Sequence, residues 1–432
     1  MPLHCLESTN SPLRAGAERS REKQREQREA ERNDLFLQLY TTRATMSAQP
    51  AASNMFETER FEFWESLLRN IQSKGKHAKE REKDKTPVLI SAMCCSNNVL
   101  VISTKLGSLI RCNANGKQYD EIELNSEKDP VKRIFIDPTG NHVLICQTSG
   151  VVYYLHSRAN KPKKVSTLSS LSIGSGQKAV KHSIECVCFD QQQSSEAASK
   201  SFLVGTNLGA IFEVGSLEPS TSSSRVSVGG SSSLSPPCHL VMQVPDVSTA
   251  ITQIYSGNFK TALSKVNRKQ SGSTVYRAVS YVLFATVYPT RIYYFATDGD
   301  ATNNSAASSA GRGSSNIVRS TFHSLFTEVQ QRNGGRHIEI PSLTLSPSVQ
   351  LQCRTSSSSP PTFALLTDTG IYHGELDSAY SSDTQLQTQL LPFLPQEEAG
   401  AGSGIAARAP PCALCMTDFH FLVLYPTQIQ VQ

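Results

Sequence analysis

The sequence predicts an all-β fold, a β-propeller of four-stranded blades, and two observations support this. The first is a hairpin pattern that returns six times: an apolar run, a turn of Thr or Gly type, and a second apolar run with aromatic residues. The copies are Val99–Cys112, His142–Leu155, Ser201–Val214, Val282–Ala296, Thr362–Leu376 and Phe421–Gln432. Two short runs rich in Val, Ile, Leu, Phe and Tyr around such a turn are typical of a β-hairpin. One hairpin buries too little apolar surface to fold alone, so we expect the copies to stack on one another.

Strand patterns between the hairpins supply the second observation. These further candidates are Pro87–Met93, Lys132–Asp137, Ile184–Phe189, His239–Val244 and Pro411–Asp418. One of them precedes most hairpins, and a strand or two joined to a hairpin is the content of a propeller blade. The spacing of the turn glycines Gly107 and Gly150 agrees with a blade of about 40–50 residues. Because the chain ends on the sixth hairpin, we expect about six blades in an incomplete ring, truncated at the C-terminus.

The segment before the repeats is predicted to be a charged or helical extension. Residues 1–55 are predicted to be charged and disordered, and within them Glu18–Arg32 alternates both charge signs, as a solvated single helix or a disordered chain does. The sequence leaves open whether translation starts at Met1 or at Met46. In residues 56–85 an amphipathic helix is predicted over Phe56–Ile71, acidic in its early turns as the helix dipole favours, before a charged linker. The propeller is predicted over residues 86–432.

The longer intervals between hairpins contain polar insertions rich in Gly, Ser and Pro. Such segments cannot bury a core and are expected to be disordered or loosely ordered loops. They are Gln191–Lys200, Glu218–Pro237, Asp298–Ser315, Arg354–Pro361 and Gln396–Pro411. Tyr276–Tyr288 is long enough for a helix, but its β-branched and aromatic residues favour a strand. Phe322–Gln331 is predicted to be a short helix within a loop.

Composition and charge exclude several classes of protein. The formal net charge of +5 over 432 residues is mild, and much of the basic excess lies near the N-terminus, so no nucleic-acid partner is expected. The first residues lack the apolar core of a signal peptide, and no apolar run approaches the roughly 18 residues of a membrane span. We therefore expect a cytosolic protein whose cysteines are reduced thiols.

The sequence offers no catalytic, cofactor or metal constellation. It contains no phosphate-binding glycine loop with Lys, no nucleophile elbow and no His-Glu-x-x-His motif. Asp137–Gly140 is explained by a type I turn between two strands. The histidines are dispersed, and His142 and His420 each precede an apolar run, as strand-entry or core residues do. No enzyme activity is predicted.

Cys412 and Cys415 form the one Cys-x-x-Cys motif of interest. A structural zinc needs four ligands, and His420 is the single further candidate nearby, so these cysteines are predicted to be buried strand residues. The same interpretation applies to Cys94 and Cys95. It applies also to the pair at 186 and 188, whose spacing directs both side chains to one face of a strand.

Two segments resemble a known family. Arg133–Ile145 (RIFIDPTGNHVLI) resembles a strand–turn–strand segment in the N-terminal propeller of the vacuolar protein sorting-associated protein 18 family, also called deep orange. Gly205–Glu218 (GTNLGAIFEVGSLE) resembles a hairpin of the same propeller. Three further segments follow in matching order, namely Asn97–Asn113, Gly370–Asp377 and Thr417–Gln430. The resemblance covers roughly residues 86 to 432.

This resemblance implies a non-enzymatic scaffold and recognition subunit of the endosomal–lysosomal tethering complexes, the class C complexes of HOPS and CORVET type. The implied role is vesicle tethering before membrane fusion, on the cytoplasmic face of late endosomes and lysosomes or vacuoles. The implied partners are other class C subunits in a hetero-oligomer, with SNAREs or small GTPases reached indirectly. The family's zinc-binding RING and α-solenoid are not in this sequence, so no cofactor is expected. No propeller residue matches a family motif of known binding role, so partner-binding residues are left unassigned.

Two alternatives remain open. One is a propeller adaptor of another pathway, although the Gly-His…Trp-Asp punctuation of WD repeats is missing and Trp64 lies outside the hairpins. The other is a propeller hydrolase, which would need polar groups converging at a central channel.

Overall fold

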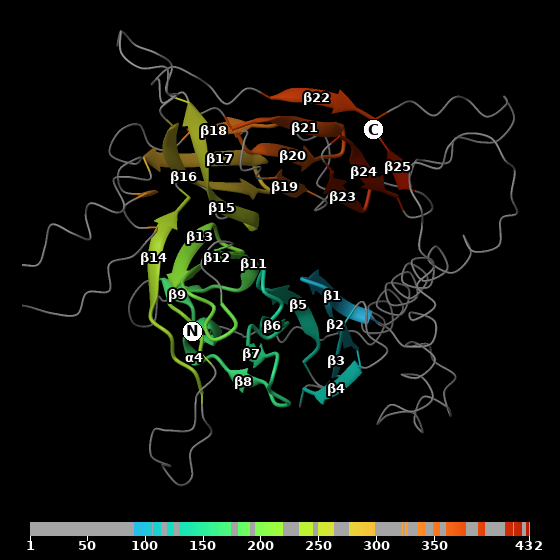
Figure 1. Cartoon of the computed structure of the whole chain (residues 1–432), viewed down its shortest axis with the longest axis vertical. Coiled ribbons are helices and arrows are strands. Elements are labelled where there is room, and N and C mark those ends of the chain that lie inside the picture. Colours follow the sequence, from blue (N-terminus) through green and yellow to red (C-terminus); the bar gives the residue numbers. More distant parts are fainter. Residues whose placement is uncertain are drawn as a thin grey trace, which may run out of the picture. The chain divides into compact units, whose positions relative to one another are not determined.

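The computed structural model describes most of the predicted repeat region (Figure 1). The described residues are 90–105, 107–113, 119–124, 129–173, 180–190, 195–218, 233–244, 249–262, 276–298, 322, 325–326, 336–341, 349–354, 360–376, 388–393, 411–417, 419–425 and 429–431. The chain divides into two compact units, one of residues 90–423 with 431–432, the other of 1–89 with 424–430. The predictions for the extension before residue 86, including the helix Phe56–Ile71, lie outside the described residues. No helix in the described part is long and apolar enough to cross a membrane.

Consecutive strands form successive antiparallel sheets, which we call blades 1 to 6 (Figure 1). Blade 1 consists of β1 (Ile90–Ser96), β2 (Val99–Thr104), β3 (Ser108–Asn113) and β4 (Tyr119–Glu123); blade 2 of β5 (Val131–Ile136), β6 (His142–Gln147), β7 (Val152–His156) and β8 (Lys163–Lys164). Blade 3 consists of β11 (Ile184–Phe189), β12 (Phe202–Thr206), β13 (Ala210–Val214) and β14 (Cys238–Gln243); blade 4 of β15 (Ile251–Ala262), β16 (Tyr276–Thr286), β17 (Arg291–Asp298) and β18 (Arg336–Glu339). Blade 5 consists of β19 (Gln350–Arg354), β20 (Thr362–Leu366), β21 (Gly370–Glu375) and β22 (Gln389–Pro392); blade 6 of β23 (Ala413–Met416), β24 (Phe421–Leu424) and β25 (Ile429–Val431). Between blades 2 and 3 lie a short helix, α4 (Ser166–Ser169), and the pair β9 (Ser172–Ile173) and β10 (Val180–Lys181).

The all-β prediction is confirmed, and each of the six predicted hairpins is the second and third strand of one blade. The stretch Tyr276–Tyr288 forms the strand β16, as its β-branched residues favoured. The strand predicted over His239–Val244 is confirmed as β14, the last strand of blade 3. The first strands of blades 4 and 5, β15 and β19, were not predicted, because polar residues interrupt their apolar pattern.

The blades pack face to face in chain order. The first strands lie next to one another, β1 by β5, β5 by β11, β11 by β15, β15 by β19 and β19 by β23. A buried apolar cluster fills each space between the first five blades. Neighbouring residues of one strand pack into clusters on opposite faces of the blade. Phe202 of β12 packs toward blade 2, whereas Leu203 packs toward blade 4. The predicted stacking of hairpins is therefore confirmed.

The repeated turn has a physical basis in its Thr and Gly residues. In blade 3 the Thr206 hydroxyl donates to Ala210 O and accepts from Ala210 N–H, both at 3.1 Å, which closes the turn between β12 and β13. Gly209 in this turn has φ +76°, a conformation that L side chains rarely adopt. The hydroxyl of Thr367 makes the corresponding bonds to Gly370 in blade 5. The turns of these two hairpins thus depend on Thr and Gly residues that the sequence displays.

Predictions for the segments between strands have mixed outcomes. The described part of the loop predicted over Gln191–Lys200 is packed and not loosely ordered, because Ser199 is fully buried and its hydroxyl accepts from Leu217 N–H at 2.9 Å. In the predicted short helix, Phe326 N–H donates to Phe322 O at 3.2 Å, one helical turn that packs against blades 3 and 4. Most of the other insertions lie outside the described residues.

Candidate functional site

A β-bulge recurs near the start of the first strand in blades 1 to 4. In each, one residue is extra relative to the second strand, because the register shifts between positions 90 and 92, 131 and 133, 184 and 186, and 251 and 253. The extra residues are Ser91, Lys132, Glu185 and Thr252. Bulges redirect side chains and are common next to functional sites. We call the polar contacts between neighbouring first strands the seams, and the seams are the candidate site.

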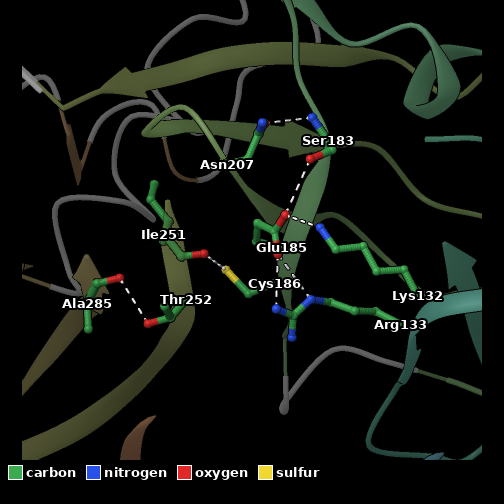
Figure 2. A network of polar contacts seen from close by, with 9 residues as sticks. All are labelled: Lys132, Arg133, Ser183, Glu185, Cys186, Asn207, Ile251, Thr252 and Ala285. Atoms are coloured by element: carbon green, nitrogen blue, oxygen red, sulfur yellow. Dashed lines mark hydrogen bonds and ion pairs between the residues drawn. The ribbon is translucent and has the colours of Figure 1, made fainter. Parts of the chain in front are cut away.

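The seam between blades 2 and 3 is ionic (Figure 2). Lys132 Nζ lies 2.5 Å from Glu185 Oε1, and Arg133 Nη2 lies 3.0 Å from Oε2. The Glu185 side chain is 10% exposed, whereas those of Lys132 and Arg133 are 39% and 44% exposed. Ser183 Oγ also donates to this carboxylate at 3.3 Å. The two cations and the one carboxylate together carry a net positive charge, and both cationic side chains reach solvent.

The same corner of blade 3 is fixed by an amide side chain. Ser183 N–H donates to Asn207 Oδ1 at 2.8 Å, and Asn207 N–H donates to Ser183 O at 3.0 Å (Figure 2). Asn207 belongs to the turn between β12 and β13. The strand that carries Glu185 is therefore held at its start by the hairpin of its own blade.

The seam between blades 3 and 4 consists of neutral thiols. Cys186 Sγ donates to Ile251 O at 3.2 Å, and Cys188 Sγ lies 3.2 Å from Ser256 Oγ. Both cysteines are buried, so the prediction that they share one face of a strand is confirmed. Burial raises the pKa of Cys188 to about 11 and also raises the pKa of Cys186. Both thiols are thus protonated at neutral pH, in which state they are poor nucleophiles and poor metal ligands.

Amide side chains make the seams that follow. Gln253 Oε1 accepts from the backbone N–H of Leu351, and Tyr255 OH donates to Leu351 O at 3.0 Å, which joins blades 4 and 5. Gln350 Nε2 donates to Cys412 O, and Gln350 Oε1 accepts from Leu414 N–H, both at 3.0 Å, which joins blades 5 and 6. A side chain that satisfies the backbone of the next first strand is a structural element and not a reactive group.

The turn at Asp137 matches its prediction. Gly140 N–H donates to Asp137 O at 3.0 Å, and the buried carboxylate accepts from Thr139 Oγ1 at 2.7 Å, Asn141 N at 2.9 Å and His142 N at 2.8 Å. Both oxygens of this carboxylate are bonded to donors from three residues of the turn, so neither is free for catalysis. A structural turn therefore accounts for Asp137, as the sequence predicts.

His142 occupies the predicted core position at the start of β6. Its Nε2 lies 2.7 Å from Ser195 O and its Nδ1 2.8 Å from Tyr154 OH. Because a carbonyl oxygen can accept but not donate, the proton is on Nε2, and Nδ1 accepts from the tyrosine. Burial lowers the pKa of His142 and favours this neutral form. His142 thus anchors the segment before β12 to blade 2.

Two cysteine predictions are wrong. Cys95 and Cys415 are exposed, and Cys94 and Cys412 are only half-buried. Adjacent residues of a strand point to opposite faces, so Cys94 and Cys95 cannot both enter the core. Within the described part of the chain, no three His, Cys, Asp or Glu side chains gather closely enough to hold a metal.

The sequence reasoning missed the ionic seam, although a signal for it was present. Lys132 and Arg133 open an otherwise apolar strand, and Glu185 is the one charged residue in β11. Charges in strands that pack on both faces need partners. Pairing the two strands by opposite charge would have indicated the contact.

Comparisons with known proteins place this geometry in context. The family described as the Pep3/Vps18/deep orange β-propeller domain matches residues 75–432. A "Vacuolar sorting protein 18" of Arabidopsis thaliana is 22% identical over 363 residues, which cover 82% of this chain and 30% of that protein. A "Vacuolar protein sorting-associated protein 18 homolog" of Danio rerio is 32% identical over 149 residues, 34% of this chain and 14% of that protein. The chain therefore spans less than a third of the length of either relative.

Among solved structures, the β-propeller domain of Cps50 (Swd1) from Myceliophteria thermophila aligns with 79% of this chain and 83% of its own. The TM-score is 0.38 and the identity is 9%. The assignment of the fold rests on the strand pairing described above and on the family match.

Proposed function

Since the chain belongs to the Pep3/Vps18/deep orange β-propeller family, we propose that it is a non-enzymatic recognition and scaffold unit of the endosomal–lysosomal class C tethering complexes, of HOPS and CORVET type. In this role it contributes to vesicle tethering before membrane fusion and to transport from endosomes to the lysosome or vacuole. The observation that carries the proposal is the family match over residues 75–432.

The state of the polar groups supports a role without catalysis. Glu185 and Asp137 are each held by several donors, and His142 has partners on both ring nitrogens. A hydrolytic site would need such groups to converge on a position that a substrate can occupy. Side chains that bind one another across seams instead make a rigid platform, which suits recognition by a surface.

The partners follow from the proposed role. They are the other class C subunits, in a hetero-oligomer, with SNAREs and small GTPases contacted indirectly. The proposed location is the cytoplasm, at the surface of late endosomes and of lysosomes or vacuoles. The mild net charge of +5 gives no reason to propose nucleic acid.

Affinity purification of the whole tagged chain from cells, followed by mass spectrometry, tests this proposal. We expect enrichment of the other class C subunits over a tag-only control. The matched variant Phe284→Ala keeps the surface and weakens the core, so it should recover less of them. If the wild-type chain is folded by circular dichroism and recovers none of these subunits, the proposal is wrong. Recovery of one different complex would favour an adaptor of another pathway.

A further inference from the structure

The outermost strands of the blades differ in how they are protected. An edge strand exposes backbone donors and acceptors, and proteins blunt such edges with charge, proline or short length. In blade 1 the edge strand β4 contains three acidic residues, and in blade 4 the edge strand β18 contains Arg and Glu. In blade 2 the edge strand β8 is two residues long and both are Lys; in blade 5, β22 ends in Pro392; and in blade 6, β25 has three residues.

The edge strand of blade 3 lacks charge, proline and short length, and its one protection is a bulge at Val241, after Cys238–Leu240. Strand β14, Cys238–Gln243, has six residues, CHLVMQ, with no acidic residue, Lys, Arg or Pro. Leu240 is 43% exposed, and His239 is exposed as well. Among the described residues no strand pairs with β14 on the side away from β13. We propose that this edge binds an extended, uncharged segment of a partner protein, which adds to blade 3 as a fifth strand.

The backbone geometry shows which groups would bind. Gly215 N–H donates to Pro237 O at 2.8 Å, so Pro237 faces β13. Alternate residues of an antiparallel strand direct their N–H and C=O to the same side, so His239 also faces β13. The N–H and C=O of Cys238 and Leu240 therefore point away from the blade. These groups fit the main chain of another strand, with specificity from the side chain that meets Leu240.

The molecule itself contains one such addition. Leu234, a few residues before β14, forms a parallel bridge with Val165 at the edge of blade 2. Leu234 N–H donates to Lys164 O at 2.8 Å, and Leu234 O accepts from Ser166 N–H at 2.9 Å. The segment that satisfies this edge is uncharged and extended, which is the chemistry we assign to the partner of β14. The chain thus runs from the edge of blade 2, which Leu234 pairs with, to β14 at the edge of blade 3, which has no strand beyond it among the described residues.

A selection from a displayed library of random nine-residue peptides on the whole chain, followed by synthesis of the enriched peptides, tests the proposal. We expect uncharged peptides without a central proline, and we expect them to slow amide hydrogen exchange in β14. Peptides that protect another part of the chain, or a failure to enrich any, would overturn the proposal.

Substitutions at two leucines of similar exposure, Leu240 and Leu390, test whether peptide binding is specific to the edge of blade 3. Leu240→Lys should weaken peptide binding about tenfold or more, a loss of about 1.4 kcal/mol. Leu390→Lys on β22, where the leucine is 46% exposed, should leave binding unchanged. Leu240→Pro should also abolish binding with little change in melting temperature, because its N–H is not bonded within the blade. Equal effects of the two lysine variants would contradict the proposal.

Sedimentation of the chain alone distinguishes a partner from a second copy. We expect a monomer. A dimer that Leu240→Lys converts to a monomer would assign the edge to self-association and overturn the proposal of a different partner.

Discussion

The seam between blades 2 and 3 and the seam between blades 3 and 4 occupy equivalent positions but use opposite chemistry. The first places a buried carboxylate, Glu185, under two half-exposed cations. The second joins protonated thiols to a carbonyl and a hydroxyl beside a fully buried aromatic cluster. The comparison shows that the repeat conserves backbone geometry, the bulge and the strand order, while side chains at the same position are free to change. It also predicts that the two seams respond differently to substitution, salt and pH.

The largest expected effect is in the core beside the thiol seam. Phe284 is fully buried and stacks on Tyr293 and Phe295, with ring centroids 4.7 and 5.9 Å away. Phe284→Ala should lower the free energy of unfolding by about 3–5 kcal/mol, because it removes buried surface and leaves a cavity. Chemical denaturation measures this loss. A loss below about 1 kcal/mol would show that the apolar cluster does not hold blades 3 and 4 together.

A second substitution tests how closely the thiol seam is packed. A Cβ on Gly205 would lie 2.6 Å from Cys186 Sγ and 2.9 Å from Ile254 Cδ1. Gly205→Ala should therefore cost about 1–3 kcal/mol through overpacking. The double variant Gly205→Ala with Cys186→Ala should recover part of the loss, since the nearest atom is gone. Additive losses in the denaturation experiment would contradict this account.

The ionic seam should tolerate more change. Glu185→Gln keeps the shape and leaves two cations without a carboxylate, but both cations reach solvent. Glu185 is buried but its two cations are partly exposed, so we expect a loss at the upper end of the range for surface ion pairs, about 1 kcal/mol. The loss should shrink as the salt concentration rises, whereas that of Phe284→Ala should not. Denaturation at low and high salt measures both, and a salt-independent loss at Glu185 would mean that its hydrogen bonds and not its charge matter.

The hairpins are the part of the fold that the sequence predicts best. Hairpins are local: two apolar runs joined by a turn of Thr and Gly are enough to identify strands such as β12 and β13. The first strands β15 and β19 are harder, because Gln253 and Gln350 interrupt their apolar pattern. Those glutamines bind the backbone of the next blade. The interruption is a consequence of tertiary contact, which propensity does not detect.

The seams themselves could not be derived from one segment at a time. A bulge exists only relative to a partner strand, so the position of Glu185 depends on its register with β12. Its cations are about fifty residues earlier in the chain. The paired cysteines at 186 and 188 were predicted correctly because alternation within one strand determines their face. Cys95 was not, because alternation excludes one of two adjacent cysteines from the core.

The smallest expected effect is a difference in pH dependence on the two sides of blade 3. His142 on the side of blade 2 is neutral and buried near His156 and Asp137, and its pKa is lowered by burial. The unfolded chain then binds a proton more readily than the folded chain. Stability from this group is complete above the ordinary pKa of about 6.5 and is lost as the pH falls through the lowered value.

Cys188 on the side of blade 4 behaves in the opposite sense. Burial raises its pKa from 9.0 to about 11, so stability from this group is complete below 9 and is lost as the pH rises toward 11. Denaturation across pH should show that His142→Gln flattens the acidic limb alone and that Cys188→Ala flattens the alkaline limb alone. If either variant flattened both limbs, the His142 contacts on one side of blade 3 and the thiol seam on the other would be one coupled unit and not two independent ones.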